Sequence, residues 1–276
     1  MTTLSDGTDT FAGRSALVTG ASSGIGAATA RALARAGARV GLVARRADRL
    51  ARVLEDCRAH SPGSAMWTAD LADLDGVPAL AAAAQDALGG VDVLVACAGM
   101  PKRRRVQDLS AAEAAELMRL NYLSPVRLAL ALLPGMTARG RGHLVAVGSV
   151  AARLGPPHEA AYAASKAALT AFWESMAVDL DGTGVHAHVV QPAIIDTELF
   201  SRPGNEPPLS DLSDALPPED VAAAVLEVVE TGRFERYVPE WFAEMAAGKA
   251  ADVEAFVAGV REWARERRIA RSGDPG

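Results

Sequence analysis

Short runs of Val, Leu and Ala alternate along the chain with longer, alanine-rich amphipathic stretches. The short runs have the length of buried strands, and the longer ones have the apolar spacing of helices that cover one face. A chain that repeats this alternation builds βαβ units, in which the strands are parallel and helices cover the sheet. We therefore expect an α/β fold with a doubly wound parallel sheet.

Seven of the short runs have the composition of strands. The expected strands cover residues 15–19, 39–44, 64–68, 91–96, 142–148, 185–190 and 236–238. The stretches between them predict helices over residues 24–36, 46–59, 76–88, 110–138, 159–181 and 217–231. The prediction is a sheet of about seven parallel strands with helices on both faces.

One domain is the expected organisation, because 276 residues with 50% hydrophobic content are near the upper size that one core serves. Residues 1–12 predict a flexible polar tail and residues 13–240 the main domain. A segment rich in Pro, Ser and Asp, at about 194–216, follows the sixth strand and predicts a mobile loop that closes over a substrate. The alternative for this segment is a surface connector without a role.

Residues 241–276 predict a helical extension packed on the same domain. Apolar residues at helical spacing support it, namely Val253, Phe256, Val257, Val260 and Ala264. Arginines that complement the helix dipole follow them, namely Arg261, Arg265, Arg267, Arg268 and Arg271. This basic end therefore requires no anionic partner.

Charge and composition exclude several function classes. A net charge of −6 argues against a general nucleic-acid binder, which normally carries a basic excess. Two cysteines are too few for a disulfide framework, and no residues have the spacing of a metal site. No apolar stretch reaches about 18 residues, and the N-terminus has no signal-peptide pattern. We expect a cytoplasmic protein without membrane or nucleic-acid partners.

A glycine-rich turn joins the first expected strand to the first expected helix. It reads Thr-Gly-Ala-Ser-Ser-Gly-Ile-Gly over residues 19–26. In this context Gly20 permits the turn, Gly24 lets a phosphate approach and Gly26 allows close helix packing. The gap between the first two glycines is longer than in G-x-G-x-x-G. The turn predicts a dinucleotide site, and a helix cap without ligand is the alternative.

The end of the second expected strand indicates which dinucleotide would bind. Ala44 is followed by Arg45 and Arg46, where an NAD-selective site would carry an acidic residue for the ribose 2′-hydroxyl. Arg45 can bind a 2′-phosphate with two hydrogen bonds, with Ser22 as a second donor. We therefore expect NADP(H) to be preferred over NAD(H). A solvated arginine at a helix start is the alternative, and it suits Arg46 better than Arg45.

Tyr162 and Lys166 are four positions apart within an expected helix, so they share one face. A nearby cation favours the phenolate and lowers the pKa of a tyrosine. Ser149 precedes Tyr162 by thirteen positions at the end of an apolar run, and Asn121 lies within the long expected helix. These residue types together indicate proton transfer. A half-buried ring beside a solvated amine is the alternative for the pair alone.

With these residues assembled, the chain resembles the short-chain dehydrogenase/reductase family from about Gly13 to Pro192. The resemblance is carried by T-G-x-x-x-G-x-G at residues 19–26, by Asp70, Asn121 and Ser149, and by Y-x-x-x-K at residues 162–166. It implies a Rossmann fold that transfers hydride between a nicotinamide cofactor and a carbonyl or alcohol, usually in a homodimer or homotetramer.

The resemblance also implies roles for individual residues. Tyr162 would be the general acid/base, Ser149 would hold the substrate oxygen, Lys166 would bind the nicotinamide ribose and lower the Tyr162 pKa, and Asn121 would support a water relay. The implied cofactor-binding residues are Gly20, Ser22, Ser23, Gly24, Ile25, Gly26, Arg45, Arg46, Asp70, Leu71, Ala98, Gly99, Tyr162, Lys166, Pro192, Ile195 and Thr197.

Two segments depart from the family pattern. Ala96-Cys97-Ala98-Gly99 stands where members commonly carry Asn-Asn-Ala-Gly, so the bracing amides are absent. Pro192-Ala193 stands where Pro-Gly is usual, and one added methyl group is tolerated at a negative φ. Cys97 is expected to be a small buried hydrophobe rather than a redox sensor.

The expected function is an NADP(H)-dependent oxidoreductase that interconverts a ketone or aldehyde and an alcohol. The alternative is a catalytically silent dinucleotide-binding regulator or scaffold with the same fold. A methyltransferase is disfavoured, because methyl transfer requires neither Tyr162 nor Lys166. The basic run at 102–105 predicts a solvated charge cluster, with a docking site for an anionic substrate as the alternative. His158 is expected to be exposed.

Overall fold

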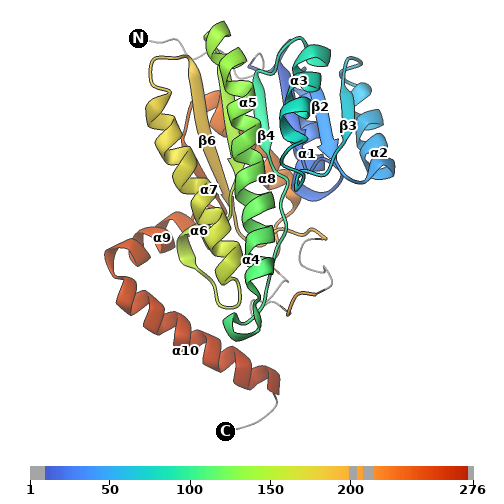
Figure 1. Cartoon of the computed structure of the whole chain (residues 1–276). Helices are drawn as coiled ribbons and strands as arrows, with labels where there is room; N and C mark the ends of the chain where they lie inside the picture. The colour runs from blue at the N-terminus through green and yellow to red at the C-terminus, as the bar shows by residue number, and fades with distance from the viewer. Residues whose placement is uncertain (1–9, 199–203, 208–213, 273–276) are drawn as a thin grey trace.

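One sheet of seven strands, with the order β3-β2-β1-β4-β5-β6-β7, organises the molecule (Figure 1). This computed structural model describes residues 10–198, 204–207 and 214–272. The strands are β1 (Ser15–Thr19), β2 (Arg39–Ala44), β3 (Ala65–Thr68), β4 (Val93–Ala96), β5 (Gly142–Val147), β6 (Val185–Pro192) and β7 (Glu235–Val238). Every neighbouring pair is parallel. The predicted doubly wound sheet is confirmed, and its strand order reverses between β1 and β4, where such sheets bind ligands.

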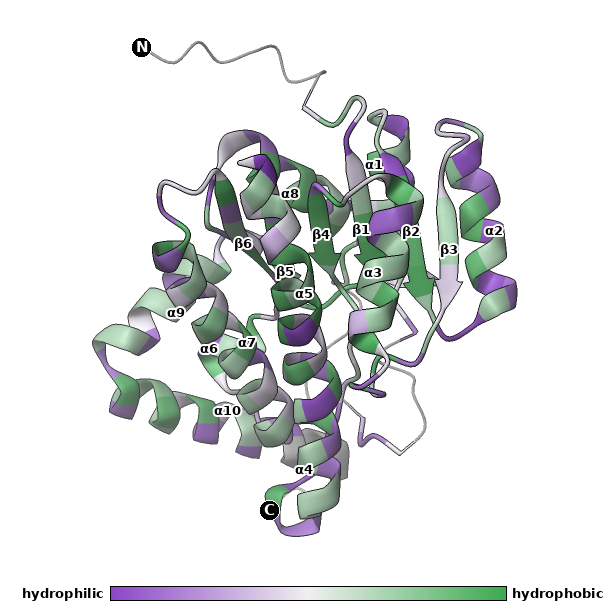
Figure 2. Ribbon diagram, turned by 45° about the horizontal axis from the view of Figure 1, so that its top comes forward, coloured by the Kyte–Doolittle hydropathy of each residue, from purple (hydrophilic) through white to green (hydrophobic). Residues whose placement is uncertain are grey.

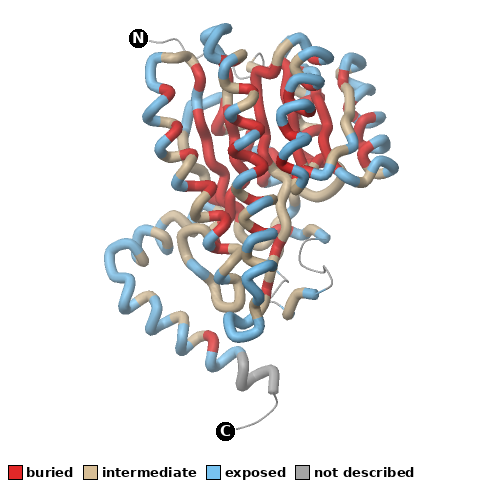
Figure 3. The backbone as a smooth tube through the Cα atoms, in the orientation of Figure 1, coloured by how far each residue is buried: buried red, intermediate tan, exposed pale blue. Residues whose placement is uncertain are grey.

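Helices cover both faces of the sheet and bury two separate cores. The first face carries α1 (Gly24–Arg35), α2 (Ala47–Arg58) and α8 (Pro218–Thr231), and the second α3 (Val77–Leu88), α5 (Ser124–Arg139) and α7 (Ala160–Asp179). Alternate strand residues serve the two cores: Ala16 and Val18 face the first, and Leu17 faces the second. The central strands are accordingly mostly hydrophobic (Figure 2) and buried (Figure 3), whereas the edge strand β3 is only partly buried.

The helix expected over residues 110–138 is confirmed in extent, but a π-helical turn that was not expected divides it. It consists of α4 (Ala111–Met118), a π-helical turn over Arg119–Leu123, and α5. A capping box between Ser110 and Glu113 begins α4. The π turn contains the buried Asn121, and such turns often occur at functional sites. Nothing in the apolar spacing signals this turn.

The C-terminal extension consists of two helices, α9 (Phe242–Ala251) and α10 (Val253–Ser272). The expected terminal helix corresponds to α10, whereas α9 and the short α6 (Ala151–Leu154) were not expected. Lys249 Nζ of α9 donates to the Arg153 carbonyl of α6 at 2.7 Å. Figure 1 shows α9 and α10 beneath the carboxyl ends of the strands.

Several of the sequence-based predictions concern residues that the structure does not describe. Most of the tail 1–12 lies outside the described residues, as do 199–203 and 208–213 of the expected substrate loop and the side chains of Arg268 and Arg271. Within the described ranges, no helix is long and apolar enough to span a membrane. The same ranges contain no group of three or more His, Cys, Asp or Glu side chains that could hold a metal ion.

Candidate active site

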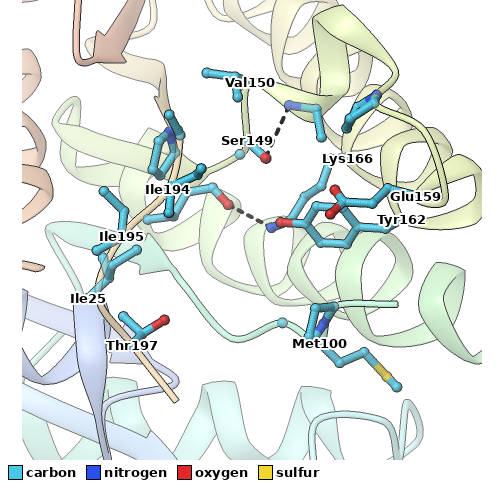
Figure 4. A pocket seen from close by; sticks show the side chains of 18 of the residues that line it. Ile25, Met100, Ser149, Val150, Glu159, Tyr162, Lys166, Ile194, Ile195 and Thr197 are labelled. Carbon is cyan, nitrogen blue, oxygen red and sulfur yellow. Dashed lines mark hydrogen bonds between the residues drawn. The ribbon is translucent and has the colours of Figure 1, made fainter. Parts of the chain in front are cut away.

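A cavity of about 1730 Å³ opens at the carboxyl ends of the strands. It begins at the glycine-rich turn between β1 and α1, passes the ends of β4, β5 and β6, and reaches α9 and α10. All the sequence-predicted site residues line it except Asn121, which lies buried directly behind it. In Figure 4, Ser149, Tyr162 and Lys166 lie across the cavity from Ile25, Ile195 and Thr197.

The glycine-rich turn has little room for side chains. Gly20 has a φ of +68°, and a Cβ there would lie 3.0 Å from the Ala98 backbone. A Cβ on Gly26 would lie 2.5 Å from the Gly20 carbonyl oxygen, so this glycine is required for the turn to close. Gly24 has a φ of +53°, and its Cβ would meet Thr197 at 2.9 Å. The glycines therefore serve the packing of the turn as well as access to it.

The first turn of α1 suits an anionic ligand. It carries no acidic side chain, and its N-cap residue Ser23 makes no capping hydrogen bond. Its N–H groups therefore have no competing carboxylate. Thr19 Oγ1 holds the adjoining strand end by accepting from the N–H groups of Cys97 and Ala98, both at 3.0 Å. These residues fit a dinucleotide phosphate, even though Ala96 and Cys97 replace the two usual asparagines.

The two arginines after β2 both line the cavity but differ in their contacts. Arg46, rather than Arg45, is engaged at the turn: it donates to Ser23 Oγ at 2.6 Å and to Ser22 Oγ at 3.4 Å. It also pairs with Glu198 at 2.8 Å. Arg45 lines the cavity and is exposed. The view of Arg46 as merely solvated is therefore wrong.

The remaining expected cofactor residues also border the cavity. Asp70 is exposed beyond β3 and accepts from the Ala72 N–H at 3.0 Å, whereas Leu71 is buried. A Cβ on Gly99 would lie 3.2 Å from Asn121 Oδ1. Further along the cavity, the cofactor candidates are Pro192, Ile195 and Thr197.

Ser149 and Tyr162 share one wall of the cavity. The Ser149 N–H donates to Gln191 Oε1 at 2.7 Å, and its Oγ accepts from the Ala151 N–H at 3.1 Å (Figure 4). The Ser149 side chain is close enough to Tyr162 to lower the pKa of the phenol. The backbone therefore fixes the serine, which places its hydroxyl against the phenol.

Lys166 lies one helical turn after Tyr162 and points toward the same wall. Its Nζ donates to the Val147 carbonyl at 2.8 Å. Asn121 lies nearby with both amide atoms bonded: Oδ1 accepts from the Met100 N–H at 2.9 Å, and Nδ2 donates to the Met100 carbonyl and to Ser165 Oγ, both at 3.0 Å. The π turn thus brings Asn121 to the segment after β4.

Burial sets the pKa values at this wall. It raises the pKa of Tyr162 above the ordinary tyrosine value, and the negative charge of Glu159 raises it further, whereas the nearby Ser149 hydroxyl lowers it. Burial lowers the pKa of Lys166 to about 8 and raises that of Cys97 to about 12. The expected lowering of the Tyr162 pKa by Lys166 is therefore not seen in this structure. The raised pKa of Cys97 agrees with the expectation that this residue is not a redox sensor.

Two residues of the site were missed from the sequence. Gln191 on β6 is fully buried, and a Cβ on Gly148 would lie 2.2 Å from its Oε1, so Gly148 makes room for it. Glu159 precedes Tyr162 by three positions at the start of α7, and burial raises its pKa to about 7. A glutamine within an apolar strand was a usable signal. A glutamate at a helix start is common and was not.

The basic run at 102–105 is not a solvated cluster. Lys102 pairs with Glu113 at 2.6 Å, and Arg105 pairs with Asp108 at 2.8 Å. Arg103 is only 3% exposed, and its Nε donates to the Glu206 carbonyl at 2.9 Å. The run instead joins the segment after β4 to residues 204–207.

His158 is not exposed, contrary to the prediction from the sequence. Its side chain is 16% exposed, and Nδ1 lies 2.9 Å from Glu206 Oε2. Its φ of +66° is unusual for a residue with a side chain.

Comparisons with known proteins agree with this geometry. The sequence matches the model of the short chain dehydrogenase family over residues 14–206. It is 34% identical over 225 residues to dehydrogenase/reductase SDR family member 7B of Danio rerio, covering 77% of this chain and 73% of that protein. It is 36% identical over 231 residues to an uncharacterized oxidoreductase of Mycobacterium tuberculosis, covering 80% of this chain and 65% of that protein.

Solved structures are similar as well. A short chain dehydrogenase/reductase from Burkholderia phymatum in complex with NAD matches with a TM-score of 0.81 and 27% identity, covering 89% of this chain and 95% of that one. A metagenomic short-chain oxidoreductase in complex with NADP matches with a TM-score of 0.70 and 32% identity, covering 83% and 97%.

Proposed function

Since this chain belongs to the short-chain dehydrogenase family, we propose that it is an NADP(H)-dependent oxidoreductase that interconverts a ketone or aldehyde and an alcohol. The observation that supports the proposal most is the joint placement of Ser149, Tyr162 and Lys166 beside the glycine-rich turn, in one cavity. A protein that only bound a dinucleotide would have no use for a buried proton donor there. This placement favours turnover over the silent regulator.

The proposed chemistry divides between the cofactor and the chain. When bound, the reduced nicotinamide supplies the hydride. In the reducing direction, negative charge develops on the carbonyl oxygen; the Ser149 hydroxyl donates a hydrogen bond to that oxygen and the Tyr162 O–H transfers its proton to it. The raised pKa keeps Tyr162 protonated at neutral pH, as a proton donor requires. In the oxidising direction the same proton returns to Tyr162.

Lys166 and Asn121 support this wall. We propose that Lys166 holds the nicotinamide ribose while Val147 fixes its ammonium group. Asn121 acts as a positioning residue for Met100 and Ser165, because each polar atom of its amide is bonded to one of them. The free lone pair of Asn121 Oδ1 remains compatible with the water relay implied by the family.

The test of the proposed function is NADPH oxidation against a panel of ketones and aldehydes, with NADP⁺ reduction by alcohols as the reverse assay. Tyr162→Phe should lower kcat by about 100-fold or more while NADPH binding is retained. Tyr122→Phe is the matched control, since Tyr122 packs edge-on against Phe172 and lies outside the cavity. Undiminished turnover in Tyr162→Phe would refute the assigned acid; NADPH binding without any turnover in the wild type would favour the silent regulator.

We propose NADP(H) over NAD(H) because two cations, Arg45 and Arg46, stand directly after β2, where an NAD-selective site would carry an acidic residue. Solved relatives are known with either cofactor, so the preference depends on this chain's own residues. Arg45→Asp and Arg46→Ala should each lower the ratio of catalytic efficiencies with NADPH and NADH by about tenfold or more. Arg52→Asp, on the exposed side of α2, should leave the ratio unchanged. An unchanged ratio in both Arg45→Asp and Arg46→Ala would contradict the proposed preference for NADP(H).

We also propose a homodimer or homotetramer in the cytoplasm. Three large apolar side chains are exposed on neighbouring helical surfaces: Leu123 (39%), Leu130 (51%) and Val178 (75%). A second copy would remove them from water. Both cysteines are free, as expected in a reducing compartment. Light scattering of the wild type and of Val178→Asp tests the assembly, and a monomeric wild type contradicts it.

A further inference from the structure

The cavity continues beyond the catalytic residues into a part that we call the apolar chamber. Its walls are Leu154, Pro156, Trp241, Met245, Phe256 and Trp263. Leu154 and Pro156 come from the segment between β5 and α7, and the other four from the C-terminal extension. Three aromatic rings and a methionine therefore face a space that is continuous with Ser149 and Tyr162.

The size of the cavity supports a second large occupant. Its volume of about 1730 Å³ exceeds the range of roughly 300–1,000 Å³ that is typical of a single small-molecule pocket. The part of the cavity beside the glycine-rich turn and the ends of β2 and β4 would hold the dinucleotide. The apolar chamber remains for the molecule that reacts with it.

The chamber wall on α10 is a helical stripe of apolar residues. Phe256, Val260 and Trp263 line the cavity at spacings of three and four, while Arg261 and Glu262 are exposed on the other face. The stripe is therefore apolar on the side that faces the catalytic wall.

Contacts hold this wall in place. Lys249 Nζ of α9 bonds the Arg153 carbonyl and lies 5.7 Å from the centre of the Phe256 ring. A smaller hollow, lined by Gly155 and Pro157 on one side and by Ala264 on the other, separates α10 from the segment before α7. Ala264 is only 2% exposed, so α10 meets the domain there.

Part of the chamber surface is exposed in the folded chain. Trp241 is 53% exposed and Met245 39% exposed, and the Trp241 ring stacks on Phe242 with centroids 3.9 Å apart. Large apolar side chains that are open to water and line a cavity mark a ligand-binding surface. An apolar ligand would remove them from water.

We propose that the substrate is a bulky, mainly apolar ketone or the corresponding secondary alcohol, whose carbonyl lies at Ser149 and Tyr162 and whose body fills the apolar chamber. This inference rests on the proposed function. It selects an apolar body over a charged one because the α10 stripe carries no ionisable group between Phe256 and Trp263 on its cavity side. Arg267 also lines the cavity, but it lies one turn beyond Trp263, with its guanidinium 5.9 Å from the centre of that ring.

The first experiment compares straight-chain 2-ketones from butanone to 2-dodecanone with NADPH. We expect kcat/KM to rise with chain length by up to about fourfold for each buried methylene group, until the chamber is filled. A flat series, or one that falls with length, overturns the inference. If no member of the series is turned over, the result counts against the proposed function. A binding measurement then tests whether the apolar chamber takes these ligands.

Binding is measured without turnover through tryptophan fluorescence. Trp241 and Trp263 lie in the chamber, whereas Trp67 and Trp173 do not line the cavity. Long 2-ketones or 2-alcohols should change the emission of the wild type and leave that of the double variant Trp241→Phe, Trp263→Phe unchanged. If the tryptophan emission does not change when these ligands are added, the inference is wrong even if small ketones are reduced. A change in emission without turnover supports ligand binding in the apolar chamber and contradicts the proposed function.

A matched pair of valines on α10 tests the wall itself. Val260→Asp places a carboxylate in the chamber and should abolish the rise of kcat/KM with chain length. Val253→Asp, at an exposed position outside the cavity, should keep the full rise. If α10 is instead covered by a second copy of the chain, Val260→Asp changes the oligomeric state and leaves the chain-length series intact, which overturns the inference. The wild-type series keeps the proposal testable if Val260→Asp does not fold.

Discussion

The two ends of the parallel sheet both bury ionisable side chains, but they use them differently. At the carboxyl end, Tyr162 and Lys166 face a large cavity. At the amino end, His143 and His188 pair across β5 and β6, with His143 Nδ1 3.0 Å from His188 Nε2. His188 Nδ1 donates to the Arg233 carbonyl at 2.8 Å, so its Nε2 accepts from His143 in the neutral pair.

Asp92 completes the amino end. It accepts from the Ser15 N–H and hydroxyl at 3.2 and 3.4 Å, and it meets Arg141 at 3.2 Å and Arg139 at 3.6 Å. Protein groups therefore satisfy the polar atoms of this end, whereas the hydroxyls of the carboxyl end also face a cavity. The difference teaches that a shifted pKa marks burial alone, and that a functional site needs an accessible space as well.

The largest expected effect that separates the two ends is on turnover. Lys166→Met should lower kcat/KM by about 100-fold or more, because the variant loses the ammonium group beside Tyr162. The free energy of unfolding at pH 7 should rise by about 1–2 kcal/mol, since the folded-state pKa of Lys166 is lowered to about 8 and its charge is therefore disfavoured by folding below that pH. Steady-state kinetics and urea unfolding measure the two. A variant that lost stability and kept its activity would reverse the comparison.

The next effect belongs to the amino end. Asp92→Asn should lower the free energy of unfolding by about 2–3 kcal/mol, because the neutral amide cannot satisfy both the Ser15 donors and the two arginines. The kcat of the folded enzyme should stay within about twofold. Asp86→Asn, on the exposed side of α3, is the matched control in urea titrations. A large loss of kcat in Asp92→Asn would show that the ends are coupled.

The same contrast explains what the sequence could predict. The strands and most helices followed from apolar spacing, because each strand feeds two cores through alternate residues such as Leu17 and Val18. The glycine-rich turn and the Y-x-x-x-K motif were local, so their placement in one cavity was predictable. These motifs predict the site because their residue types and their spacing are set by the same local backbone geometry.

What could not be predicted depends on contacts between distant segments. The π turn at Asn121 follows from bonds to Met100 and Ser165, which spacing along one helix does not encode. The burial of Arg103 depends on Glu206, about a hundred residues away. The choice of Arg46 over Arg45 at the turn depends on Glu198 in the same way.

The third effect is on stability at low pH, and it also belongs to the amino end. Burial lowers the pKa of His143 to about 3 and lowers that of His188 too, so the folded state binds fewer protons than the unfolded state. Their contribution is fully present above about pH 6.5 and is lost as the pH falls, by about 1–2 kcal/mol between pH 8 and pH 5. Unfolding curves at several pH values should show this loss in the wild type.

His143→Asn removes the titrating group and keeps a donor for His188, so its stability should depend less on pH over this range. His60→Asn, at an exposed position, should behave as the wild type. A wild-type stability that does not change between pH 8 and pH 5 would contradict the assigned role of the pair.

The smallest effect returns to the carboxyl end, at Glu159. Its carboxylate raises the Tyr162 pKa, although burial is the larger cause, so Glu159→Gln should lower that pKa. Carbonyl reduction needs protonated Tyr162, and the alkaline limb of kcat/KM should therefore move to lower pH by less than about one unit. Glu116→Gln, exposed on α4, controls for a general loss of negative charge. A limb that stays in place or moves to higher pH would contradict the assigned effect of Glu159 on the phenol.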